Sequence, residues 1–94
     1  WNDVNPATKM YEPVKMPLRY VAEMFCDRLA ASKIYQGKAY VDSHPLAYFQ
    51  RGKSYRVIHP ATSDLIESWL TLLAEEGEQA GFTRIRQMLK AGEY

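Results

Sequence analysis

Hydrophobic residues recur at helical spacing over residues 16–37, MPLRYVAEMFCDRLAASKIYQG, and predict a helix there. One face of this helix carries Leu18, Val21, Ala22, Phe25, Leu29 and Ser32. Apolar side chains fill most of its other faces, and among them we expect Cys26 to be a small core residue. Pro17 suits the first helical position and Gly37 suits the end. Since a helix that is apolar nearly all round is normally the centre of a bundle, the pattern predicts a buried interior helix over about residues 17–35.

The second half of the chain carries further helical patterns, joined by short segments. A brief helix is predicted over residues 44–52, a long helix with a clear apolar face over residues 60–76, and a last helix over residues 79–89. The joining segments, residues 38–41 and 53–58, suggest short extended connections. Together these elements predict an all-α fold, a small helical bundle around one central apolar helix.

Residues 1–15 contain two prolines, two asparagines and no sustained period, which predicts an irregular arm that docks through its apolar residues. A length of 94 residues fits one domain, so residues 1–94 are assigned to a single helical domain. Because the chain opens with Trp1, we expect it to be the C-terminal portion of a longer chain. Such a portion exposes apolar surface, so the expected partners are the missing N-terminal segment or a second copy of the chain in a homo-oligomer.

Composition narrows the functional classes. The formal net charge is +1, which gives no global electrostatic reason to bind nucleic acid or a membrane. A single cysteine excludes an intramolecular disulfide and fits the reducing cytoplasm, where we expect the protein to be located. No apolar run approaches the roughly 20 residues that span a bilayer, and no signal peptide is visible.

A polar strip crosses the central helix where Arg19, Glu23 and Asp27 follow one another at intervals of four residues. The two neighbouring carboxylates repel each other unless a cation, a proton or an arginine lies between them. One interpretation is a solvent-facing strip with Arg19 and Arg28 as ionic partners. The alternative is a site in which Asp27 is a metal ligand and Glu23 assists catalysis.

The two histidines, His44 and His59, each precede a proline at a predicted helix start. Neither belongs to a metal-binding pattern such as HExxH, so local capping of the helix is the simplest interpretation of both. We retain them as further candidate site residues, because histidine changes its protonation near neutral pH.

Basic and aromatic residues alternate from Lys33 to Arg56, where Asp42 is the one acidic residue. This composition suggests phosphate binding, with Lys33, Arg51 and Lys53 as the candidate residues. The alternative is a solubilising rim over a tyrosine-rich core. Because the whole chain is nearly neutral, we expect no specific nucleic-acid partner.

Arg51 and Tyr55 have the R-x-x-x-Y spacing found around the proximal tyrosine of haem catalases. Haem also requires a large apolar pocket and suitable distal groups, which a chain of this length and composition does not supply. We therefore expect no haem.

The run MPLRYVAEMFCDRLAASKIY, followed by GKAYVDSHPLAYF and VIHPAT, resembles the C-terminal half of an uncharacterised family of small helical proteins from bacteria and their phages. The matching positions are Met16-Pro17, Tyr20, Glu23-Met24, Cys26-Asp27, Lys33, Tyr35 and His59-Pro60. Full-length members are distantly similar to HD-type phosphohydrolases, in which a late helical aspartate completes a metal site. The resemblance implies that Asp27 is this aspartate, that Glu23 supports it and that Lys33 or Arg51 meets phosphate.

This chain contains no His-Asp pair, so we expect no cofactor for the chain alone and a divalent metal only in the intact protein. Two functions follow as hypotheses. The first is part of an HD-like, metal-dependent phosphohydrolase that acts on a phosphate-containing small molecule or nucleotide. The second is a non-enzymatic helical module for protein interaction.

Overall fold

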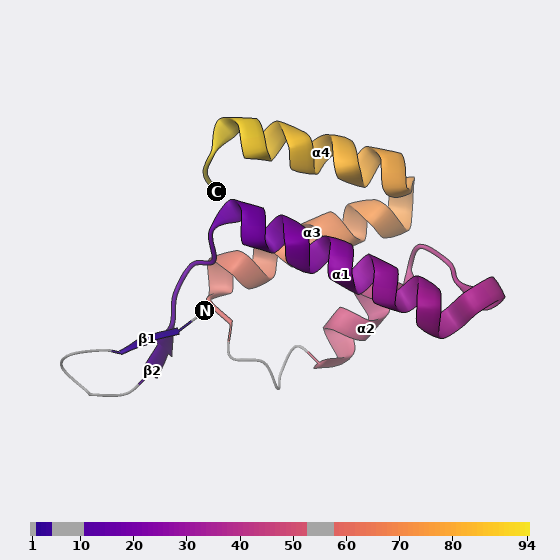
Figure 1. The fold of residues 1–94 in the computed structure, drawn as a ribbon, viewed down its shortest axis with the longest axis horizontal. Helices are drawn as coiled ribbons and strands as arrows, with labels where there is room; N and C mark the ends of the chain where they lie inside the picture. The colour runs from indigo at the N-terminus through magenta and orange to yellow at the C-terminus, as the bar shows by residue number, and fades with distance from the viewer. Residues whose placement is uncertain (1, 5–10, 53–57) are drawn as a thin grey trace.

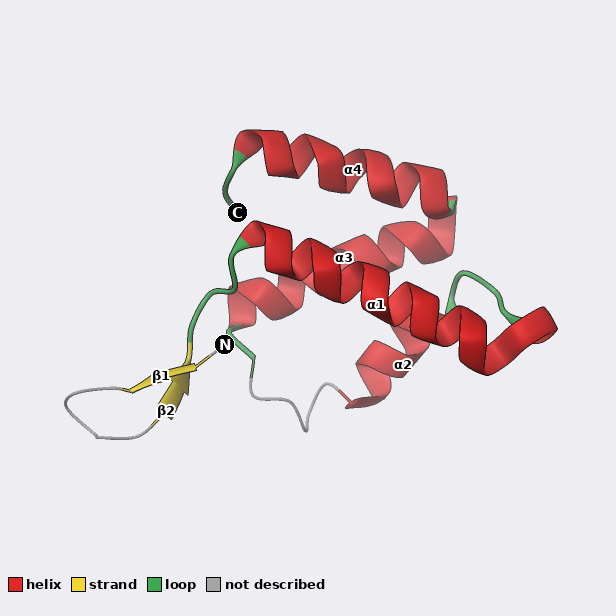
Figure 2. Cartoon of the chain, viewed as in Figure 1, coloured by secondary structure: helices red, strands yellow, loops and turns green. Residues whose placement is uncertain are grey.

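The computed structural model describes residues 2–4, 11–52 and 58–94. Its described part is an all-α bundle with a small two-stranded appendage (Figures 1 and 2), so the predicted fold class is confirmed. In chain order the elements are β1 (Asn2–Val4), β2 (Tyr11–Pro13), α1 (Leu18–Gln36), the 3-10 helix η1 (Gly37–Ala39), α2 (His44–Gly52), α3 (Pro60–Glu76) and α4 (Glu78–Ala91).

Local backbone chemistry sets the helix ends. α1 begins directly after Pro17 and ends at Gly37, whose φ of 56° lies in the region that favours glycine. α3 begins at Pro60, and the Nδ1 atom of His59 accepts a hydrogen bond from the backbone N–H of Ala61 at 3.1 Å. The predicted bounds of α3 are confirmed, and α4 is slightly longer than the predicted helix over residues 79–89.

The core lies between α3 and the helices on either side of it. α3 and α1 each contact all three of the other α-helices. The Phe25 ring packs edge-to-face with the rings of Trp69 and Phe82, at centroid distances of 6.3 and 5.9 Å. The indole N–H of Trp69 also donates a hydrogen bond to the sulfur of Met88 at 3.3 Å. These contacts join α1, α3 and α4 around one aromatic centre.

The prediction that α1 is buried on nearly every side is wrong. Its buried side chains are Leu18, Val21, Phe25 and Leu29, which form one face. Cys26 is exposed rather than part of the core, and Ile34 and Tyr35 are 83% and 87% exposed. A 19-residue helix is about 28 Å long, and three shorter neighbours cannot surround it. Its last turns extend beyond α3 and α4 (Figure 1). Asp27, in the middle of α1, is exposed and therefore does not lie at a polar seam inside the bundle.

Two connecting segments also differ from the predictions. The arm over residues 1–15 includes an antiparallel ribbon, in which Asp3 of β1 lies opposite Glu12 of β2. Residues 38–41, predicted to be extended, begin within η1 and continue into a turn, because the backbone N–H of Tyr40 bonds to the carbonyl of Gly37. Most of the second predicted extended segment, residues 53–57, lies outside the described residues.

Candidate functional site

A groove of about 500 Å³ lies between the second half of α1 and the neighbouring face of α2. We call it the α1–α2 groove. The residues that line it are Arg28, Ala31, Ser32, Tyr35 and Gln36 from α1, and His44, Pro45, Ala47, Tyr48 and Arg51 from α2. No acidic side chain of the described residues belongs to this lining, so the groove is basic.

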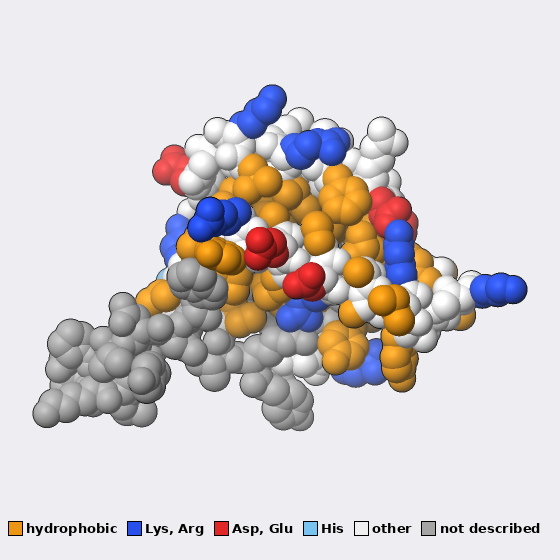
Figure 3. Space-filling view, viewed as in Figure 1, with side chains coloured by type: hydrophobic (Ala, Val, Ile, Leu, Met, Phe, Trp, Pro, Cys, Tyr) orange, Lys and Arg blue, Asp and Glu red, His pale blue; other side chains and the backbone are white. Residues whose placement is uncertain are grey.

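Regular spacing on both helices builds the groove. The lining positions follow one another at intervals of three and one residues on α1, and of one, two and three residues on α2, which places most of them on one face of each helix. α2 runs back beneath α1 after the turn that follows η1 (Figure 1). The Arg28 guanidinium lies over Phe49, in the half of α2 that also carries Arg51, whereas Lys33 and His44 both contact the Tyr40 ring. Basic and hydrophobic side chains gather along this edge of the molecule (Figure 3).

The core fixes the position of the Arg28 side chain. Its guanidinium carbon lies 5.2 Å from the centroid of the Phe49 ring, and Phe49 is buried. A guanidinium over an aromatic face is attracted by the ring electrons, and its stem packs on apolar surface. Arg51, two residues after Phe49 on α2, is exposed. The groove thus combines one arginine held by the core with one that is free to adjust.

His44 lies at the start of α2, and its orientation follows from two contacts. Its Nδ1 atom accepts a hydrogen bond from the backbone N–H of Val41 at 3.2 Å, and its ring meets the edge of Tyr40 at a centroid distance of 6.0 Å. An Nδ1 atom that accepts carries no proton, so the neutral ring has its proton on Nε2. His44 therefore supplies a hydrogen-bond donor to the groove that it lines.

Lys33, a predicted phosphate-binding residue, does not line the groove. Its Nζ atom forms an ion pair with Glu78 at the start of α4 and lies 5.7 Å from the centroid of the Tyr40 ring. Burial, together with the nearby carboxylates of Asp42 and Glu78, raises the pKa of Tyr40. This cluster joins the end of α1 to the turn between α3 and α4, so the described contacts of Lys33 are structural.

The other predicted site residues lie apart from the groove. Glu23 and Asp27 are exposed on the open side of α1, where acidic side chains are visible among hydrophobic ones (Figure 3). Within the described ranges, no three histidine, cysteine, aspartate or glutamate side chains lie together as a metal site requires. His59 caps α3, as the capping interpretation predicted. Lys53 lies outside the described residues.

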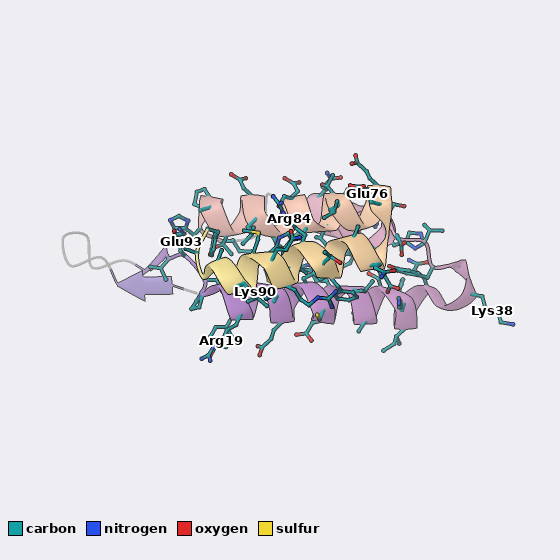
Figure 4. The ribbon with its side chains drawn as sticks, turned by 90° about the horizontal axis from the view of Figure 1, so that it is seen from above. Arg19, Lys38, Glu76, Arg84, Lys90 and Glu93 are labelled. Carbon is teal, nitrogen blue, oxygen red and sulfur yellow. The ribbon has the colours of Figure 1, made fainter. Side chains whose placement is uncertain are left out.

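Arg19, at the start of the polar strip, points away from the bundle (Figure 4). Its guanidinium stacks on the neighbouring Tyr20 ring at 4.9 Å and donates a hydrogen bond to the Tyr20 hydroxyl at 3.3 Å. Lys38 likewise projects beyond the end of η1 (Figure 4). Neither side chain contributes to the α1–α2 groove.

The sequence analysis missed the contribution of Arg28, which it treated only as a partner for the acidic strip. A signal for it exists in the sequence. Arg28, Ser32 and Tyr35 on α1 have the same four-and-three spacing as the triplet of His44, Tyr48 and Arg51 on α2. This spacing places each triplet on one face of its own helix, and the structure shows that the two faces line one groove.

Comparisons with known proteins add one result. A family model described as a family of unknown function (DUF5662) matches residues 1–72, a range that includes α1, α2 and the whole α1–α2 groove. Neither the curated proteins nor the solved structures contain a match. In the described part of the chain, no helix has the length and apolar character needed to cross a membrane.

Proposed function

The chain belongs to DUF5662, a family of unknown function, and from the geometry of the α1–α2 groove we propose that it binds a phosphate-containing small molecule or nucleotide. The observation that carries this proposal is that Arg28, which lies over Phe49, and Arg51, two residues after Phe49, line one groove whose described lining is free of acidic side chains. The match agrees with the expected uncharacterised family and brings no activity with it.

The chemistry of the lining suits a phosphate group. The planar guanidinium of arginine presents paired donors that match two phosphate oxygens. Arg28 is already placed by Phe49, so binding sacrifices little of its side-chain freedom. The hydroxyl of Ser32 and the Nε2–H of His44 add directed donors from the two walls of the groove.

For the intact protein we propose a cytoplasmic, HD-like phosphohydrolase of bacterial or phage origin, supported by the motif around Glu23 and Asp27. The residues described for this chain do not make up a metal centre, because these two exposed carboxylates have no third ligand beside them in the described ranges. In this proposal the chain holds the phosphate ester, and further metal ligands come from outside it. Metal analysis of the intact protein after reconstitution tests the idea. Stoichiometric metal that is lost in Asp27→Ala supports it, and absence of bound metal contradicts it.

Phosphate binding is tested directly by calorimetric titration of the chain with inorganic pyrophosphate. We expect saturable binding that weakens at least about ten-fold in Arg51→Ala, since a charge-assisted hydrogen-bond pair contributes about 1.5–3 kcal/mol. Arg28→Lys keeps the charge but loses the paired donors, and it should also weaken binding. Arg86→Ala is the matched control, because Arg86 is an exposed arginine on α4 outside the groove. Absence of binding, or equal loss in all three variants, would contradict the proposal.

A second candidate function, a helical module for protein interaction, is favoured by the open end of α1. Ile34 and Tyr35 are largely exposed there, and Val41 nearby is 52% exposed. Such a surface suits a second copy of the chain. Sedimentation equilibrium tests this idea. Self-association that is lost in Ile34→Ser supports it, and a monomer at high concentration contradicts association through this surface.

A further inference from the structure

We infer that the ligand of the α1–α2 groove carries a planar aromatic group beside its phosphate, as a nucleoside monophosphate does. This inference rests on the proposed phosphate binding and narrows it to one chemical class. The observation behind it is that two exposed tyrosines, Tyr35 and Tyr48, line the same groove as the two arginines.

The two tyrosines of the groove present their rings to solvent. Tyr35 on α1 is 87% exposed and Tyr48 on α2 is 63% exposed. In the described part of the chain, Tyr20, Tyr40 and Tyr94 each contact a cation or another ring, but no such contact involves Tyr35 or Tyr48. Each of these two rings lines the groove and offers a face on which a flat ligand can stack.

The spacing between the arginine and the tyrosine on each helix suits a nucleotide. Along α1, Tyr35 lies seven residues beyond Arg28, a rise of about 10 Å. Along α2, Tyr48 lies three residues before Arg51, a rise of about 4.5 Å. A sugar that joins a phosphate to a base bridges a gap within this range. Inorganic phosphate or a sugar phosphate would contact the two arginines and leave both tyrosine rings uncovered.

Polar groups beside the rings suit the edge of a base. Gln36 follows Tyr35 on α1 and lines the same groove. Its side-chain amide both donates and accepts hydrogen bonds, as the edge of a base requires. Ser32 lies between Arg28 and Tyr35 along α1 and supplies a hydroxyl to the same groove.

Calorimetric titration of the full chain, run separately with the 5′-monophosphates of adenosine, guanosine, cytidine and uridine, tests the inference. Ribose 5-phosphate is the comparison ligand, because it has the phosphate and the sugar without the base. We expect at least one nucleotide to bind about five-fold or more tightly than ribose 5-phosphate, since a stacked base contributes about 1 kcal/mol or more. Tyr48→Ala and Tyr35→Ala should reduce that advantage, and Tyr48→Phe should preserve it.

Two controls separate the possible outcomes. Val41→Ala changes an exposed apolar residue outside the groove and should leave every affinity unchanged. Circular dichroism verifies that the tyrosine variants remain folded. If ribose 5-phosphate binds as tightly as all four nucleotides and Arg51→Ala weakens both classes, the aromatic inference is wrong and phosphate binding stands. The inference is also wrong if the nucleotide still binds more tightly than ribose 5-phosphate in both Tyr48→Ala and Tyr35→Ala. If no phosphate compound binds, the proposed function itself fails.

Discussion

The hydroxyl of Tyr94 lies 2.6 Å from the hydroxyl of Thr62, although 31 residues separate them in the chain. The Tyr94 hydroxyl donates to the carbonyl of Met16, and the Thr62 hydroxyl accepts from the backbone N–H of Met16. Because the Tyr94 proton is used in this way, Thr62 must be the donor to Tyr94. These bonds tie the entrance of α1, the start of α3 and the residues after α4 together, and the ammonium of Lys15 adds a bond to the Tyr94 carbonyl.

Thr62→Val should destabilise the protein by about 1–3 kcal/mol. Valine has nearly the same shape, but it leaves the Met16 N–H and the Tyr94 oxygen without their partner in a partly buried place. Urea denaturation measures the change. Thr83→Val is the control, because Thr83 is exposed on α4 and its replacement should change stability by less than about 0.5 kcal/mol. A Thr62→Val protein as stable as the control would contradict the importance of this network.

The two faces of α1 should respond very differently to truncation. Phe25→Ala removes a fully buried ring that meets Trp69 and Phe82, and we expect a loss of about 3–5 kcal/mol. Tyr35→Ala on the same helix should change stability by less than about 0.5 kcal/mol, because that ring is exposed. Thermal and urea denaturation of both variants measure the difference. A large loss in Tyr35→Ala would mean that the end of α1 is buried in solution.

The thiol of Cys26 should react with alkylating reagents in the folded protein, but more slowly at neutral pH than a free cysteine does. Partial burial and, secondarily, the negative charge of Asp27 raise the pKa of Cys26. A raised pKa means less thiolate at neutral pH, so the midpoint of the rate-against-pH curve lies above that of a free cysteine. Asp27→Asn removes the charge and should move the midpoint to lower pH. Glu76→Gln is the control, because Glu76 lies at the end of α3 (Figure 4), and it should leave the midpoint unchanged. An unchanged midpoint in Asp27→Asn would show that the carboxylate does not act on the thiol.

Lys33→Gln should leave pyrophosphate affinity within about two-fold of the parent, in contrast to Arg51→Ala. The reason is that Lys33 pairs with Glu78 outside the groove. The same variant should lose at most about 1 kcal/mol of stability, since exposed ion pairs contribute little. Calorimetry and urea denaturation of the one protein give both values. A ten-fold loss of affinity would restore Lys33 as a phosphate-binding residue.

Local features of the sequence determined how well each element could be predicted. Pro17, Gly37 and Pro60 act on their own backbone, so the ends of α1 and the start of α3 were predictable. The burial of α1 was not, because it depends on how many helices are present to cover Ile34 and Tyr35. An apolar side chain favours burial, but it becomes buried only where a neighbouring helix is long enough to cover it.

The candidate site was likewise predictable only in part, because some of its features depend on contacts between distant segments. Arg51 and His44 were candidates from the sequence, and α2 brings both into the groove. Lys33 was a candidate for the same reason, but Glu78, a residue 45 positions later, pairs with it at another place. Charge and spacing identify residues able to bind phosphate, whereas contacts between distant segments select which of them face the same space.

Trp69 is an internal fluorescent probe of the bundle, because its indole contacts Phe25 of α1 and Met88 of α4. Three helices converge on a single shielded chromophore, so its emission should shift to longer wavelength as soon as any one of them separates. The chain has one other tryptophan, Trp1, and Trp1→Phe would remove its signal. Fluorescence of that variant would then follow assembly of the bundle without an added dye.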